Sequence, residues 1–380
     1  MLSDDASDQT ISGQAFKLFH WIIDERLRIG RSTVADSTAL TRRARIDLLK
    51  LARAHKRPAV FVVFDADVDE CLRRDSLRAR PVGPDVIRAQ FVRFLKSKID
   101  IPSEDWDQVI TVKNAKPGET STDVRIGTFD LRSESGPFDI IGDVHGCADE
   151  LKELLAKLGY VHGANGDISH PEGRRIIFLG DLADRGPKNV EVLKLAMRVV
   201  HLGNGFYIPG NHCNKLMRYL QGRRVAQSNG LNLTVSEVEA TEAREPGFKI
   251  ALHDFIANAP TYLWLDGGAL VVAHGGIKAG MIGRDDRAVQ TMCLYGDITG
   301  KTNPDGTPVR LDWAEHYRGS AAVVYGHTPK SAALWRNNTI NIDQGCVFGG
   351  ALTALRWPER EIVQVEAHAV YDPSKDIDSL

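Results

Sequence analysis

The stretch Ile140-Ile141-Gly142-Asp143-Val144-His145-Gly146 decides the fold of the longer part of this chain. Its apolar run predicts a buried strand, and the glycine that follows leads directly to an aspartate and a histidine. Carboxylates and neutral imidazoles are ligands for divalent metals such as Zn, Mn and Fe. One such pair is weak evidence, because a polar residue after a strand is usually an ordinary turn residue.

Five later stretches repeat the same pattern of an apolar strand followed by a polar, metal-capable residue. The strands are predicted at 174–179, 206–209, 270–273, 322–325 and 339–342, and the residues after them are Asp181, Asn211, His274, His327 and Asp343. In α/β sheets, sites form at the carboxyl ends of strands. Coincidence at six strand ends is improbable, so the sequence predicts one metal site built from Asp143, His145, Asp181, Asn211, His274 and His327.

Length and composition favour an ordinary two-domain protein. The chain has 380 residues and a formal net charge of −2, so no global basic field indicates nucleic acid. No apolar run approaches the ~20 residues of a membrane span, and the acidic N-terminal stretch does not resemble a signal peptide. The five cysteines are scattered without a Cys-x-x-Cys pair, which favours a reduced compartment. We therefore expect a cytoplasmic protein without a membrane partner.

Residues 1–115 alternate between helical and strand patterns. Helices are predicted at 14–28, 40–55 (capped by Thr38), 67–78 and 84–98, and strands at 33–35, 59–64 and 109–112. This alternation predicts an α/β unit with a parallel sheet.

Several segments of this unit carry a resemblance: residues 2–5, 8–10, 31–38, 71–75 with Arg78, and 83–88. They resemble the kinase module of the bacterial polynucleotide kinase-phosphatase of RNA repair. The resemblance implies that Arg74 and Arg78 cover a donor phosphate, while the plainer interpretation is a solvated basic face.

The sequence lacks the phosphate-binding loop Gly-x-x-x-x-Gly-Lys-[Ser/Thr] that such kinases need. The nearest string, Gly296-Asp297-Ile298-Thr299-Gly300-Lys301-Thr302, is one residue short and precedes a turn. We therefore expect a partial kinase-like domain without kinase activity, which could serve as a scaffold. A misplaced start codon would give the same sequence.

The motifs Gly142-Asp143-Val144-His145-Gly146, Gly180-Asp181-Leu182-Ala183-Asp184-Arg185-Gly186 and Gly210-Asn211-His212 resemble those of the calcineurin-like metallophosphoesterases, in their phosphoprotein-phosphatase-like branch. This implies a metallophosphoesterase α/β sandwich. Residues 324–329 and 342–356 are similar to the phosphatase module of the same repair enzyme, whose ligase module is not expected here. The predicted domains are a partial kinase-like domain (1–115), a linker (116–136), a binuclear metallophosphoesterase domain (137–371) and a flexible tail (372–380).

Two metals sharing one carboxylate would clamp a phosphoryl group for in-line attack. Asp143 and His145 would hold the first metal, Asp181 would bridge, and Asn211, His274 and His327 would hold the second. Mn is the expected metal, with Ni, Fe and Zn as alternatives.

The resemblance also implies catalytic roles beyond the metal ligands. His212 is the expected general acid, Asp184 orients it, and Arg185 binds phosphate. Asp343 stands where the repair phosphatase requires a carboxylate, and it could orient a histidine ligand. Cys213 replaces an acidic residue of most relatives, which is expected to affect the rate more than the type of reaction.

The first functional hypothesis is a phosphatase that removes 2′- or 3′-phosphates from polynucleotide ends in nucleic-acid repair, and that could also open 2′,3′-cyclic phosphates. Its expected partners are an RNA or DNA end and other RNA-repair proteins; the sequence does not reveal the oligomeric state. Arg218, Arg223 and Arg224 could contact the polynucleotide or simply form a solvated face. The alternatives are a protein Ser/Thr phosphatase, a diadenosine tetraphosphatase and a non-catalytic repair scaffold.

Overall fold

The computed structural model describes residues 12–29, 31, 33–55, 57–113, 128–163, 167–303 and 308–375. The chain forms two compact units, Met1–Gly127 and Thr128–Leu380. The segments at 2–10, the first part of the predicted linker (116–127) and the end of the predicted tail (376–380) lie outside the described residues. Within the described parts, no helix is long and apolar enough to cross a membrane.

The first unit has the predicted alternation of helices and parallel strands. Its helices are α1 (Ser12–Arg28), α2 (Arg42–Ala54), α3 (Val68–Ser76) and α4 (Pro84–Asp100), and its strands are β1 (Val60–Asp65) and β2 (Gln108–Lys113). The strands pair in parallel with Val60 opposite Gln108. The strand predicted at 33–35 is absent: Val34 is 94% exposed, and a β-branched run forms a strand only where another strand accepts its hydrogen bonds. Thr41, and not Thr38, caps α2.

The arginines on α3 and just after it pair with acids of this helix. Arg74 Nε donates to Glu70 Oε1 at 2.6 Å, and Arg78 Nη1 lies 3.8 Å from Asp75 Oδ1. Both arginine side chains are more than a third exposed. These contacts fit the solvated basic face that the sequence had left open.

The second unit contains two six-stranded sheets. The first has the order β14-β15-β13-β10-β9-β3, and the second has β16-β17-β4-β7-β8 with β18 paired to β17. The strands of the first sheet are β3 (Asp130–Leu131), β9 (Leu263–Leu265), β10 (Leu270–Val272), β13 (Ala322–Tyr325), β14 (Trp335–Arg336) and β15 (Thr339–Asn341). Those of the second are β4 (Phe138–Ile141), β7 (Arg175–Leu179), β8 (Gly205–Ile208), β16 (Asp343–Gln344), β17 (Ala351–Trp357) and β18 (Glu361–Glu366).

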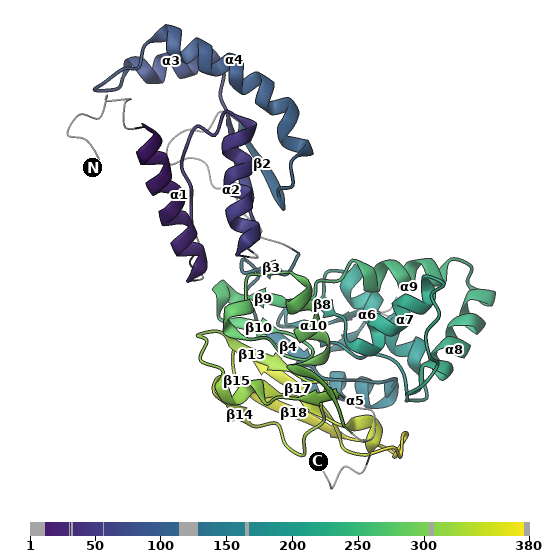
Figure 1. Ribbon diagram of the computed structural model, residues 1–380. Helices are drawn as coiled ribbons and strands as arrows, with labels where there is room; N and C mark the ends of the chain where they lie inside the picture. The colour runs from purple at the N-terminus through teal and green to yellow at the C-terminus, as the bar shows by residue number, and fades with distance from the viewer. Residues whose placement is uncertain are drawn as a thin grey trace. The chain divides into compact units, whose positions relative to one another are not determined.

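The described residues of this unit also form helices and two small antiparallel strand pairs. The helices are α5 (Ala148–Leu158), α6 (Asn189–His201), α7 (Asn211–Leu220), α8 (Leu231–Arg244), α9 (Phe248–Ala257) and α10 (Arg287–Tyr295). The strand pairs are β5 (Val161–His162) with β6 (Ile168–Ser169), and β11 (Ile298–Thr302) with β12 (Pro308–Arg310). Helices α6 to α9 lie together on one side of the sheets (Figure 1).

The central strands are buried on both faces, which explains their continuous apolar sequences. Ile140 and Ile177 pack in the cluster shared with the other sheet, whereas Ile141 and Phe178 pack in the cluster shared with the helices. Successive side chains of a strand point to opposite faces, so one strand serves both cores. The predicted α/β sandwich, preceded by a separate α/β unit, is confirmed.

Part of the predicted linker belongs to the sandwich. β3 pairs in parallel with β9, with Asp130 opposite Trp264. Phe129 is 1% exposed and stacks on Tyr262 with 4.7 Å between ring centroids. The polar composition of this stretch suggested a linker, but burial of one aromatic side chain fixes it to the sheet.

Replacing Arg174 with alanine is expected to destabilise the second unit by about 3–5 kcal/mol. The Arg174 guanidinium binds the fully buried Asp139, with Nε 3.0 Å from both carboxylate oxygens, and Nη2 donates to the Phe138 carbonyl. The variant leaves the buried Asp139 charge without its main partner. Urea unfolding followed by circular dichroism measures the loss.

The control is Lys194→Ala, which breaks a half-exposed ion pair with Glu245. Such a pair contributes no more than about 1 kcal/mol. Equal unfolding midpoints for the two variants would contradict the prediction.

Candidate active site

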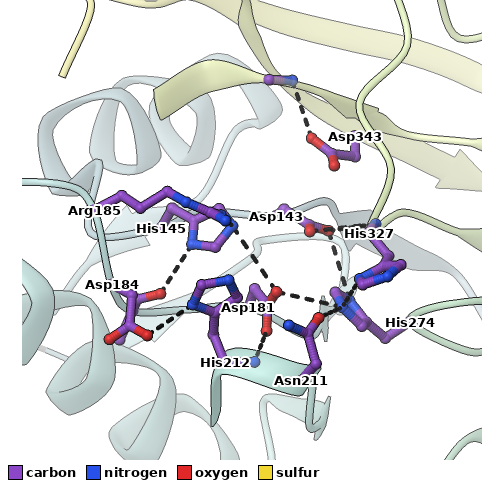
Figure 2. Close-up of polar contacts among 12 residues, drawn as sticks. Asp143, His145, Asp181, Asp184, Arg185, Asn211, His212, His274, His327 and Asp343 are labelled. Atoms are coloured by element: carbon purple, nitrogen blue, oxygen red, sulfur yellow. Dashed lines mark hydrogen bonds and ion pairs between the residues drawn. The ribbon is translucent and has the colours of Figure 1, made fainter. Parts of the chain in front are cut away.

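The predicted site residues meet at the ends of neighbouring strands. Asp143 and His145 follow β4, Asp181 follows β7, and Asn211 and His212 open α7 after β8. His274 follows β10 and His327 follows β13 in the other sheet. Figure 2 shows these residues together with Asp184, Arg185 and Asp343. The structure thus brings all ten predicted residues into one region.

Two groups of possible metal ligands share Asp181. The donor atoms of His145, Asp181 and His212 lie within 4.8 Å of one another, as do those of Asp181, His274 and His327. The shared carboxylate is the one predicted to bridge.

Asp143 was predicted to share a metal with His145, but its carboxylate contacts two residues of the second group. Its carboxylate accepts from the His327 backbone N–H at 3.3 and 3.4 Å, and its Oδ1 is 3.8 Å from His274 Nδ1. His212, predicted to be the general acid, takes the place beside His145 in the first group.

Backbone carbonyls orient two of the imidazole rings. His145 Nδ1 donates to the Ala183 carbonyl at 2.9 Å, and His274 Nδ1 donates to the Leu179 carbonyl at 3.1 Å. A carbonyl only accepts, so each Nδ1 carries a proton and each Nε2 is the atom available to a metal.

Nitrogen and oxygen donors converge around the ring of His274. Its Nε2 lies 3.1 Å from Asn211 Oδ1, 3.2 Å from His327 Nδ1 and 3.4 Å from Asp181 Oδ2. Imidazole, carboxylate and carboxamide donors facing one another are a suitable ligand set for a divalent cation.

The electrostatics of the cluster favour positive charge. Burial raises the pKa of Asp143 well above its usual value, and the charge of Asp343 adds to this shift. Burial acts in the same direction on Asp181, but the charges of His274 and His212 hold its pKa well below the usual value. Burial disfavours the His274 imidazolium, yet Asp181 and Asp143 raise the pKa of His274 to about 9. Buried carboxylates need compensating charge, and the residues therefore fit two divalent cations.

Two glycines let the ligands approach closely. A Cβ on Gly180 would lie 2.2 Å from His274 Nδ1, and one on Gly210 would lie 2.1 Å from Asp181 Oδ1. Any side chain at either position would displace a ligand, which explains why glycine precedes Asp181 and Asn211.

Four site residues adopt the left-handed backbone region although they are not glycine. The φ angles are 45° for His145, 76° for Asp184, 72° for Arg185 and 72° for His327. Each such residue costs on the order of 1 kcal/mol or more, and strain of this kind concentrates at functional sites.

A hydrogen-bonded chain holds His212. Its Nδ1 lies 2.7 Å from Asp184 Oδ2, and Asp184 Oδ1 accepts from Thr234 Oγ1 at 2.6 Å. The Asp184 N–H also donates to Thr234 Oγ1. The pairing of His212 with Asp184 agrees with the predicted geometry. Thr234, on α8 of the segment between His212 and His274, was missed because no local sequence pattern marks it.

Two arginines approach the cluster from different elements. Arg185 Nη1 lies 2.7 Å from His145 Nε2, and Arg310 Nη2 lies 3.0 Å from His327 Nε2. A guanidinium at the edge of a metal cluster is well suited to bind phosphoryl oxygens. Arg310 was missed, since it belongs to β12 and no motif includes it. The rejected Gly296–Thr302 string forms β11 of the same hairpin and does not open a helix.

Asp343 stabilises the turn that follows it. Its Oδ1 accepts from the Gly345 N–H at 3.0 Å, its own N–H donates to Asn341 Oδ1, and burial raises its pKa. Among the described residues, no hydrogen bond joins its carboxylate to a histidine. The prediction that Asp343 orients a histidine ligand is therefore not supported by a contact.

The basic residues after α7 lie apart from this cluster. Arg223 and Arg224 line a surface pocket with Tyr219, Val225, Ala226 and Gln227, and none of the predicted metal ligands lines it. Arg218 lies in the last turn of α7.

We expect iodoacetamide at neutral pH to leave the activity of the folded protein unchanged and Cys213 unmodified. Cys213 is fully buried, and burial together with the charge of Asp181 raises its pKa to about 12. The thiol therefore stays protonated and cannot act as a nucleophile. Mass spectrometry locates the modified cysteines, and Cys71, which is partly exposed, is the positive control. Loss of activity in step with alkylation of Cys213 would contradict this prediction.

Comparisons with known proteins agree with the division of the chain. Residues 136–341 match the family described as calcineurin-like phosphoesterase, and residues 2–98 match an AAA domain. The protein named bis(5′-nucleosyl)-tetraphosphatase PrpE (asymmetrical) of Anoxybacillus flavithermus is 50% identical over 239 residues, which cover 63% of this chain and 97% of that protein.

Two further relatives carry the same name. The protein of Halalkalibacterium halodurans is 52% identical over 229 residues, covering 60% of this chain and 93% of its own length. The protein of Bacillus subtilis is 49% identical over 241 residues, covering 63% and 98%.

Proposed function

This chain belongs to the calcineurin-like phosphoesterases, and from that premise we propose that it hydrolyses bis(5′-nucleosyl) tetraphosphates. The proposal rests on one observation: the sequence is 50% identical to a relative of that name, over 97% of the length of that relative. The sequence had placed polynucleotide ends first and this substrate among the alternatives. The relatives support the alternative better, so the order is reversed.

Calcineurin-like phosphoesterases use a dinuclear metal centre, and six side chains of this chain would hold it: Asp143, His145, Asp181, Asn211, His274 and His327. When bound, the two cations polarise a phosphoryl group and acidify water. The nitrogen and oxygen donors suit Mn²⁺, which we propose as the metal, and they also suit Fe, Zn and Ni. Activity after reconstitution with each metal in turn tests this choice.

The remaining residues of the site bind the substrate and move a proton. Arg185 and Arg310 offer guanidinium N–H groups to phosphoryl oxygens. His212, held by Asp184 and Thr234, donates a proton to the leaving oxygen as the phosphoanhydride P–O bond breaks. Asymmetrical cleavage of diadenosine tetraphosphate consumes one water and yields ATP and AMP, whereas symmetrical cleavage yields two ADP.

The test offers three substrates to the purified full chain with Mn²⁺: diadenosine tetraphosphate, a 3′-phosphorylated oligonucleotide and a phosphopeptide. Ion-exchange chromatography should reveal ATP and AMP in equal amounts, with the dinucleotide as the best substrate. Chelation of the metal is the control and should stop the reaction. Phosphate release from the oligonucleotide or the peptide, with the dinucleotide intact, would overturn the proposal.

Polynucleotide-end hydrolysis remains the second candidate. It is favoured by the first unit, whose residues 2–98 match an AAA domain and whose sequence resembles a polynucleotide kinase. Because residues 1–380 contain no phosphate-binding loop, we expect no transfer of phosphate from ATP to a 5′-hydroxyl oligonucleotide. A radiolabelled product in that assay would contradict our interpretation of the first unit. No activity on any substrate, with metal bound, would favour the scaffold hypothesis.

A further inference from the structure

The end of the described chain returns to the active site. We call residues 367–375 the C-terminal strap. The Ala367 N–H donates to the Gly350 carbonyl at 2.8 Å, and the N–H groups of Tyr371 and Asp372 donate to the Val347 carbonyl at 3.0 and 2.9 Å. The Tyr371 hydroxyl donates to the Glu150 carboxylate at 2.8 Å. Residues 372–375, predicted to be part of a flexible tail, therefore follow an anchored path.

These anchors place the strap beside the turn that contains Asp343. Val347 belongs to the 3-10 helix η5 (Cys346–Phe348), which directly follows β16 and Gly345. Val370 packs against Gly349, where an added Cβ would lie 2.7 Å from Val370 Cγ2. The position of the strap is thus set by the loop that follows Asp343.

The strap brings two charged side chains to Arg185. Asp372 Oδ2 lies 3.2 Å from Arg185 Nε, and the two side chains are only 19% and 15% exposed. Lys375 Nζ lies 5.1 Å from the centre of the Phe348 ring, and Arg185 Cζ lies 5.2 Å from the centre of the same ring. Two cations therefore share one aromatic side chain beside the candidate metal ligands.

The side chain of Lys375 is accessible to a ligand. Its residue remains exposed, and among the described residues no carboxylate lies within ion-pair distance of its ammonium. Partial burial of the ammonium lowers its pKa, the charges of Asp343 and Asp143 oppose this shift, and those of Arg185 and Arg310 add to it. The Lys375 ammonium and the Arg185 guanidinium share the Phe348 ring, so a phosphate oxygen between these two cations would be attracted by both.

We propose that Lys375 is a specificity-determining residue that binds a phosphate adjacent to the one being cleaved. This inference rests on the proposed function, because a tetraphosphate chain carries further phosphates past the metal centre and a monoester carries none. Arg185 binds the phosphate under attack beside the candidate metal ligands, and Lys375 binds its neighbour. Asp372 holds the strap against Arg185, so the two cations keep a fixed separation.

The test compares wild type with Lys375→Met on two substrates, diadenosine tetraphosphate and p-nitrophenyl phosphate. We expect the KM for the dinucleotide to rise about tenfold while its kcat stays nearly constant, as for loss of an interaction made equally in the ground and transition states. The kinetics of the monoester should not change. Lys375→Arg should restore the low KM because it keeps the charge. Lys157→Met removes a charge from α5 and is the control.

A second measurement does not depend on the natural substrate. Calorimetric titration of the Mn²⁺-loaded protein with inorganic tripolyphosphate should show about tenfold weaker binding to the Lys375→Met variant, equal to about 1.4 kcal/mol. Equal binding of tripolyphosphate to both proteins, or an equal kinetic loss on the monoester, would overturn the inference. Failure of the proposed function is separately visible, because the wild type would then leave the dinucleotide intact.

Discussion

Asp181→Ala is expected to reduce the bound metal from two ions per chain to one or fewer and to lower kcat/KM by at least ~10³-fold. Asp181 is the one residue common to both candidate ligand groups. Its Oδ2 lies 3.4 Å from His274 Nε2 and 3.9 Å from His145 Nε2, and its Oδ1 accepts from the His212 N–H at 2.9 Å. The substitution therefore removes a shared ligand and a contact that positions His212.

Metal content by elemental analysis and hydrolysis of diadenosine tetraphosphate measure the two effects separately. The matched control is Asp254→Ala, which removes a carboxylate 60% exposed on α9. Circular dichroism should show that both variants are folded. Two bound metals and unchanged activity in Asp181→Ala would refute the assignment of the bridging ligand.

His212→Gln is expected to lower kcat by about 10²–10⁴-fold while the metal content stays unchanged, as for loss of a general acid. The ring is 4.8 Å from that of His145, centre to centre, and its Nδ1 is fixed by Asp184 at 2.7 Å. Asp184→Asn and Thr234→Val should give smaller losses, because they loosen the ring without removing it.

The leaving group distinguishes proton donation from a structural role. A general acid matters most when the leaving oxygen is basic, so the loss should be greater for phenyl phosphate than for p-nitrophenyl phosphate, whose phenol is more acidic. The same loss for both esters would indicate that His212 only binds metal or maintains structure. Metal binding is a definite alternative role for His212, because it lies within one of the two candidate ligand groups.

The group of candidate metal ligands could be predicted because its signal is local. Asp143, Asp181 and His274 each follow a short apolar run. Strands β4 and β7 are parallel neighbours that end at a common edge, and His274, after β10 of the other sheet, lies beside Asp181. These residues could be recognised without knowing where the helices pack. Thr234, Arg310 and Lys375 reach the site through a helix, a hairpin and the C-terminal strap. Their positions depend on tertiary packing, which leaves no periodic mark in the sequence.

The substrate was harder to predict than the reaction class for a physical reason. Metal ligands act on the phosphoryl group that all candidate substrates share, so the motifs cannot distinguish a polynucleotide end from a dinucleotide. The resemblance of the first unit to a kinase favoured the polynucleotide. Likewise, the composition at 128–136 indicated a linker, although Phe129 stacks on Tyr262 and β3 joins the sheet.

The left-handed backbone at His145, Asp184, Arg185 and His327 limits how far the stability of this protein can be raised without loss of activity. Glycine adopts that conformation without the steric penalty that every other residue incurs there. A laboratory lineage selected only for resistance to heat would be drawn to relieve this strain. Such a selection would favour variants that are more stable to heat but have lost catalytic activity. Hydrolysis must therefore be measured in every round of selection.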